Sequence, residues 1–71
     1  MSGSTQRLWR VRKRYDHIDA EIQPRGSEWE LRITRNGRRL LSWRFPNRVA
    51  ASAEAVSRRH ELERSGWHSH W

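Results

Sequence analysis

The chain has 71 residues and no cysteine, so it is predicted to form one small domain without disulfide bonds or thiolate metal sites. Its 15 lysines and arginines outnumber eight aspartates and glutamates, giving a formal net charge of +7. No apolar run approaches the roughly 20 residues of a membrane span, and residues 1–6 lack the apolar stretch of a secretory signal. We therefore expect a soluble, cytoplasmic protein.

Four segments alternate apolar and polar residues, as half-buried strands do. Short turn-forming stretches separate them, at residues 14–15, 24–27 and 35–37. Connections this short predict an antiparallel meander in the order 1-2-3-4. The apolar positions are Trp9 and Val11; Ile18, Ala20 and Ile22; Trp29, Leu31 and Ile33; and Leu41, Trp43 and Phe45.

The turn at Arg35-Asn36-Gly37 sets the register of the last two strands, because Asn-Gly between alternating hydrophobics strongly favours a hairpin. We expect a three-residue loop with Gly37 as a bulge residue, which opposes Trp29 to Trp43 on one face. The same reasoning pairs Ile22 with Trp29 in the preceding hairpin. In the first hairpin it pairs Val11 with Ile18 and Trp9 with Ala20.

The pattern changes after Phe45 and Pro46 to an alanine-rich, charged stretch that predicts one helix. Asn47 is the favoured N-cap, with Ser52 as the alternative, and Gly66 is the expected left-handed residue past the C-terminus. Leu62 and Trp67 then occupy the two positions that touch in a Schellman motif. We expect one arc of the helix to face the sheet and its small residues to allow close approach; the arc contains Val49, Ser52, Ala53, Ala55, Val56, Arg59 and Leu62.

These elements predict an α+β fold, a four-stranded antiparallel meander with one C-terminal helix packed on its apolar face. Trp9, Trp29 and Trp43 are expected in the core. We expect a disordered segment at residues 1–6, a single ββββα domain at 7–67 and a tail at 68–71.

Charges divide between the outer sheet face and the turns. We expect the outer face to be balanced, with Arg10, Arg12, Arg32 and Arg44 against Asp19, Glu21, Glu28 and Glu30. Arg10 and Arg32 should flank Asp19, and Glu28 should lie across from Arg44. The surplus of positive charge is therefore expected at the turns and the helix end.

The first and third turns of a meander lie at the same end of the sheet, which predicts a basic rim of Lys13, Arg14, Arg35, Arg38 and Arg39. The helix should bring Arg58, Arg59 and Arg64 towards this rim. Clustered arginine with Trp67 or Trp71 nearby suits phosphate contacts with base stacking. We therefore expect a non-enzymatic domain that binds DNA or RNA. The alternative is a protein–protein interaction or homodimerisation module that uses an edge strand.

The Trp-Glu-Leu-Arg-Ile strand, the Arg-Asn-Gly-Arg-Arg turn and the Ala-Glu-Ala helix resemble the arm-binding domains of tyrosine recombinases and plant AP2-type DNA-binding domains. The resemblance covers Ser27 to about Glu63. It implies DNA contact through the outer sheet face, at Arg10, Arg12, Arg32 and Arg44. In size and layout the chain is also similar to short bacterial proteins of unknown function.

No catalytic constellation or phosphate-binding glycine loop is visible in the sequence, and we expect neither a cofactor nor an enzymatic activity. His68 and His70, with His60, could in principle hold a metal ion. Two histidines in a terminal segment are weak evidence, and we expect no metal site.

Overall fold

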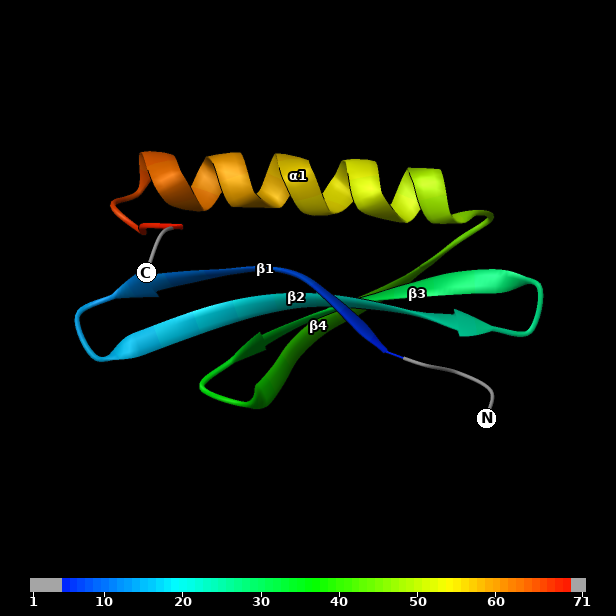
Figure 1. The fold of residues 1–71 in the computed structure, drawn as a ribbon, viewed down its shortest axis with the longest axis horizontal. Helices are drawn as coiled ribbons and strands as arrows, with labels where there is room; N and C mark the ends of the chain where they lie inside the picture. The colour runs from blue at the N-terminus through cyan, green and yellow to red at the C-terminus, as the bar shows by residue number, and fades with distance from the viewer. Residues whose placement is uncertain (1–4, 70–71) are drawn as a thin grey trace.

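A computed structural model describes residues 5–69 of the chain. It contains strands β1 (Gln6–Lys13), β2 (Asp16–Arg25), β3 (Glu28–Arg35) and β4 (Arg38–Phe45), followed by helix α1 (Arg48–Arg64). The strands form one antiparallel sheet in the order β1-β2-β3-β4, and α1 lies lengthwise across one face (Figure 1). The predicted α+β meander is thus confirmed. No helix in this described part is long and apolar enough to cross a membrane.

The third turn is tighter than expected. Arg35 pairs with Arg38, which leaves Asn36 and Gly37 as a two-residue loop, with φ of 53° and 85°. Two positive φ values define the type I′ hairpin turn, whose twist matches that of the flanking strands. The expected three-residue loop is therefore wrong. The bulge lies in β4, where Leu40 is the extra residue between two pairs of the ladder.

The register of the first hairpin is as predicted, with Val11 opposite Ile18 and Trp9 opposite Ala20. The other two hairpins are shifted by two residues from the expected pairing. Leu31 lies between Ile22 and Trp43, because the turn at Gly26 and Ser27 is also a tight two-residue connection. A shift of two residues leaves every side chain on its original face. Trp29 and Trp43 therefore lie on the same side of the sheet, as predicted.

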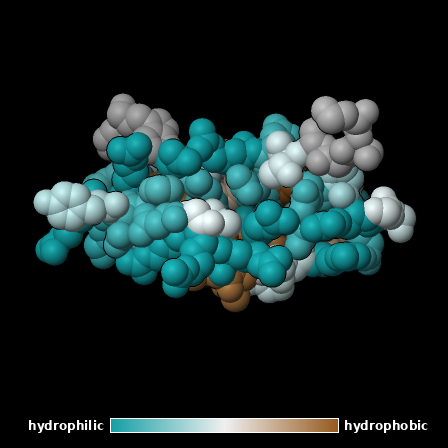
Figure 2. Space-filling model, turned by 90° about the horizontal axis from the view of Figure 1, so that it is seen from below, coloured by the Kyte–Doolittle hydropathy of each residue, from teal (hydrophilic) through white to brown (hydrophobic). Residues whose placement is uncertain are grey.

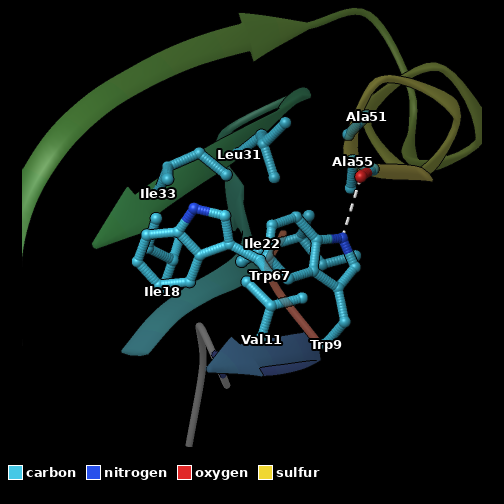
Figure 3. Close-up of a cluster of buried hydrophobic side chains, with 10 residues drawn as sticks. Trp9, Val11, Ile18, Ile22, Leu31, Ile33, Ala51, Ala55 and Trp67 are labelled. Atoms are coloured by element: carbon cyan, nitrogen blue, oxygen red, sulfur yellow. Dashed lines mark hydrogen bonds between the residues drawn. The ribbon is translucent and has the colours of Figure 1, made fainter. Parts of the chain in front are cut away.

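The core lies between this face and α1 (Figure 3). Its buried members are Trp9, Val11, Ile18, Ala20, Ile22, Leu31, Ile33, Ala51, Ala55 and Trp67. Trp9 also donates a hydrogen bond from Nε1 to the carbonyl oxygen of Ala55, at 2.8 Å. Trp29 and Trp43 are only half-buried at the margin of the core, where Arg48 and Arg58 from the helix lie over their rings.

The helix face agrees only in part with the expected one, because Ala55 and Leu62 pack against the core as expected whereas the buried Ala51 lies outside the expected arc. Ala51 and Ala55 are fully buried, whereas Val49 is 78% exposed, and Ala53 and Val56 are also exposed. Alanine lets the helix backbone approach the indole of Trp9 closely enough to accept its hydrogen bond. The close approach of the helix backbone to the Trp9 ring therefore favours alanine on this face, although valine is more hydrophobic.

Both predicted helix ends are confirmed. Asn47 is the N-cap, and its Oδ1 accepts a hydrogen bond from the Ala50 amide at 2.8 Å. At the C-terminus Gly66 has φ of 96°, and the Trp67 amide donates to the Leu62 carbonyl at 3.0 Å in a Schellman motif. This cap turns the chain back and buries Trp67 in the core.

Residues near both limits of the described part contact the sheet. Gln6 already belongs to β1, and His68 forms an isolated bridge to Arg12. Both residues lie just outside the range 7–67 expected for the domain. The remainder of the expected N-terminal segment other than Thr5, and His70 and Trp71 of the tail, lie outside the described residues.

Candidate nucleic-acid interface

The first and third turns of the sheet are joined directly. The Asn36 amide donates to the His17 carbonyl at 2.9 Å, and the His17 amide donates to Asn36 Oδ1 at 2.9 Å. The Asn36 side chain also donates from Nδ2 to Asp16, at 3.0 Å. Asn36 therefore makes the turn and also holds the two loops together. Lys13, Arg14, Arg35, Arg38 and Arg39, the basic rim, are carried by these two turns and their flanking strand ends.

The C-terminal end of α1 reaches the same end of the sheet (Figure 1). Lys13 Nζ donates to the carbonyl oxygen of Ser65 at 3.1 Å, just past the last helical turn. Lys13 and Arg35 also lie 5.9 and 5.7 Å from the ring centroid of Trp67. Trp67 thus serves as a platform on which two rim cations are placed side by side.

One carboxylate offsets part of this charge. Asp16 accepts hydrogen bonds from Asn36 and, at 2.7 Å, from Arg35. The bonds from Asn36 and then Arg35 hold the pKa of Asp16 below its usual value, so the group is ionised at neutral pH. Lys13, Arg14, Asp16, Arg35 and Trp67 line one surface hollow, and a second hollow is lined by Arg35, Asn36, Arg38 and Leu40. Arg35 therefore borders both.

The three helix arginines that were predicted to approach the rim differ in their surroundings. Arg58 pairs with Glu54 at 2.8 Å and lies 4.7 Å from the ring centroid of Trp43, which directs it towards β4. Arg59 lies 4.0 Å from Glu63, one turn further along the same helix. Arg64 is exposed in the last helical turn, beside the residue that accepts the hydrogen bond from Lys13. Arg64 is thus the predicted helix residue nearest in sequence to the contact between the helix end and the rim.

Two aromatic side chains near the rim, Trp67 and Tyr15, differ in their exposure. Trp67 is only 9% exposed, so its ring is not available for stacking on a base. Tyr15 at the tip of the first turn is instead almost fully exposed. Tyr15 therefore does not lean on a neighbouring strand.

The outer face of the sheet carries arginines and carboxylates that are largely paired. Arg10 contacts Asp19 at 2.5 Å, Arg25 contacts Glu30 at 2.9 Å, and Arg44 lies 3.5 Å from Glu28. Figure 2 looks onto the side of the sheet opposite α1 and shows a mainly hydrophilic surface. The predicted contact between Arg10 and Asp19 is therefore present. Arg44 contacts Glu28, but the residue across from it on β3 is Glu30 and not Glu28 as expected.

Two further expectations about this face are wrong. Arg32 lies opposite Glu21 instead of flanking Asp19, whose neighbour on β3 is Thr34. The face is also not neutral, because the observed register adds three arginines to the four expected. Seven arginines against four carboxylates leave a surplus of three positive charges. The added residues are Arg7, Arg25 and Arg39.

Comparisons with protein-family models, curated proteins and solved structures found no match. The proposal below is therefore based on the geometry of the rim.

Proposed function

We propose that the chain is a non-enzymatic domain that binds nucleic acid through its basic rim. The observation that carries the proposal is the convergence of two turns and the helix end on one cationic surface. Among the described residues, the two turns and their flanking strand ends carry five cations and one carboxylate, Asp16, which pairs with Arg35. Arg64 follows in the last turn of α1. Guanidinium groups pair with phosphate in a bidentate manner, so a surface rich in arginine suits a polyanionic backbone.

The rim offers phosphate contacts and one exposed aromatic ring. Tyr15 projects from the first turn between Arg14 and Asp16, at a position where a base could stack beside bound phosphates. Stacking on an aromatic ring combined with backbone contacts is a mode of binding that tolerates many sequences and needs unpaired bases. This arrangement favours single-stranded DNA or RNA over a duplex.

The outer sheet face is the weaker candidate surface. The resemblance to arm-binding and AP2-type domains points to this face, but Arg10, Arg32 and Arg44 each lie within 4 Å of a carboxylate there. Phosphate or base contacts would have to displace those ion pairs. The rim has one carboxylate for five cations, so contact there requires less rearrangement.

The salt dependence of binding tests the proposal. Fluorescence anisotropy with labelled single-stranded and duplex oligonucleotides should give a falling affinity with rising salt. Four phosphate contacts predict a slope of log K against log salt of about −2.8 on single strands and about −3.6 on duplex DNA. Absence of binding to every oligonucleotide at low salt would refute the proposal.

A charge-matched pair of variants locates the surface. Replacing Arg35, Arg38 and Arg39 by Gln should weaken binding by about 10- to 100-fold and flatten the salt slope. The control replaces the exposed residues Arg7, Arg44 and Arg48, which lie away from the two turns, and has the same net charge. Equal losses in both variants would mean that overall charge, and not the rim, accounts for binding.

A further inference from the structure

The two edge strands of the sheet differ in whether other backbone segments pair with them. On the β1 edge, Arg12 and His68 exchange two backbone hydrogen bonds of 2.8 and 2.9 Å, so the segment after α1 occupies part of that edge. Within residues 5–69, no backbone hydrogen bond reaches the outer edge of β4. Unpaired amide and carbonyl groups along an edge strand form a template for another strand. β4 is therefore the edge open to addition.

An apolar groove runs beside this open edge, on the side that faces the helix. Leu41 of β4 is 48% exposed, whereas Ile33, its partner on β3, is only 6% exposed. The helix therefore covers β4 less fully than β3 at this pair, although Trp43 and Phe45 further along β4 pack against the core. None of the core residues labelled in Figure 3 comes from β4. The groove has a volume of about 300 Å³, and Ile33, Leu40, Leu41 and Leu62 are among the residues that line it. Arg58 and Glu61 of α1 also line it, one of each charge.

The charge of the edge identifies what it can accept. β4 contains Arg38, Arg39 and Arg44 and no carboxylate. Arg39 makes no ion pair among the described residues, and the contact of Arg44 with Glu28 is a long, exposed one of 3.5 Å. Pairing two copies of β4 would bring six arginines together, which disfavours a second copy of this chain. An acidic strand would instead find complementary charges.

The bulge at Leu40 limits the regular part of the edge to Leu41–Phe45. Along this stretch Leu41, Trp43 and Phe45 lie on the helix side, and Ser42 and Arg44 lie on the outer side. A strand added here would place alternate side chains on the helix side, beside Leu41, Trp43 and Phe45, and the others on the outer side, beside Ser42 and Arg44. The pattern that fits is therefore an alternation of apolar and acidic residues.

We propose that β4 binds an extended peptide of alternating apolar and acidic residues as a fifth strand of the sheet. Main-chain hydrogen bonds would supply part of the affinity, as in other complexes formed by strand addition. The apolar groove and the arginines would select the peptide. This proposal shares Arg38 and Arg39 with the basic rim, but it rests on the open edge of β4 and does not depend on nucleic-acid binding.

The test uses a capped heptapeptide, Glu-Val-Glu-Leu-Glu-Val-Glu, titrated into the full chain and followed by anisotropy and amide chemical shifts. We expect saturable binding with the largest shifts in Leu41–Phe45. A scrambled peptide with its apolar residues adjacent should bind about tenfold more weakly, because it cannot place them all on one side. Equal binding of the two peptides, or shifts centred on β1, would overturn the proposal.

Backbone methylation tests for strand addition directly. Two versions of the peptide are methylated at alternate amides, one at the odd and one at the even positions. Only one set of amides can face β4, so one version should lose about tenfold or more in affinity and the other should bind nearly as the parent does. Similar affinities of the two versions would overturn strand addition.

Reversing the charges of β4 and of the peptide gives a test that a loss of folding cannot imitate. The double variant R39E/R44E should lose affinity for the glutamate peptide and gain affinity for its lysine counterpart, Lys-Val-Lys-Leu-Lys-Val-Lys. A gain of binding cannot arise from unfolding. If the exchange leaves the preference unchanged, the arginines of β4 do not select the ligand and the proposal fails.

Discussion

Replacing Glu30 by Gln is predicted to destabilise the domain far more than a surface carboxylate change normally does. The Glu30 side chain is only 9% exposed although it lies on the outer sheet face. Its Oε1 accepts from Gln23 at 2.8 Å and from Arg25 at 2.9 Å, and Arg32 lies 3.6 Å away. The hydrogen bond from Gln23, opposed by burial and supported by the two arginines, lowers the pKa of Glu30 from 4.5 to about 2.

The size and sign of the effect follow from this pKa. A fall of about 2.5 pKa units corresponds to about 3 kcal/mol of stability, because each unit is worth about 1.4 kcal/mol. The folded-state pKa lies below the unfolded one, so this stabilisation is complete above pH 4.5 and is lost as the pH falls through 2. We expect E30Q to cost about 2–3 kcal/mol at pH 7, since the glutamine can keep neutral hydrogen bonds.

Urea unfolding of the wild type and E30Q over a pH series provides the measurement. The difference in free energy of unfolding should shrink towards zero as the pH approaches 2. The control is E28Q, because Glu28 is 50% exposed and its contact with Arg44 is 3.5 Å long. It should cost less than about 0.5 kcal/mol. Equal costs for the two variants, or a difference that does not depend on pH, would refute the reasoning.

Three further predictions concern the helix and its contact with the sheet. Asn47→Ala removes the oxygen that accepts from Ala50 and should lower stability by about 1 kcal/mol, measured by urea unfolding. Gly66→Ala should cost a similar amount, about 1 kcal/mol, because its φ of 96° strains any other residue while the added methyl would meet only ordinary contacts; no change in the thermal midpoint would contradict the Schellman cap. Trp9→Phe removes the hydrogen bond to Ala55 and part of a buried ring, and should cost about 2 kcal/mol; a smaller loss than that from Asn47→Ala would show that the bond contributes little.

The faces of the sheet could be predicted from the sequence, and Asn-Gly is itself a signal for the tight third turn, but the bulge at Leu40 that accompanies this turn could not be predicted. The alternation of apolar residues determines which side chains share a face, and that assignment survives any error of two residues in register. The tight turns at Gly26-Ser27 and Asn36-Gly37 and the bulge at Leu40 depend on local twist, which the alternation does not encode. Trp29 and Trp43 were therefore placed on the correct face with the wrong partners.

The helix face was predicted only in part: Ala55 and Leu62 pack against the core as expected, whereas Val49, Ala53 and Val56 are exposed. Val49 and Val56 are more apolar than Ala51 and Ala55, yet the alanines face the sheet. A buried indole whose Nε1 needs an acceptor requires the helix backbone to come close. The sequence does not show that Trp9 would find this acceptor in a helix carbonyl.

The site was predictable where topology alone brings residues together. A meander places its first and third turns at one end, which correctly grouped the rim residues around Asp16 and Arg35. The side-chain contacts of Arg58 were not predictable, because they depend on the helix rotation and on the position of Trp43. The burial of Trp67 likewise depends on where the chain runs after the Schellman cap.

We propose the basic rim as the surface that contacts nucleic acid. The most direct test is an amide chemical-shift titration of the intact protein with a short single-stranded oligonucleotide at low salt. We expect the largest shifts in residues 13–16 and 35–39, with smaller changes near Arg64. Shifts concentrated on the outer sheet face at Arg10, Arg32 and Arg44, or no shifts at all, would contradict the claim.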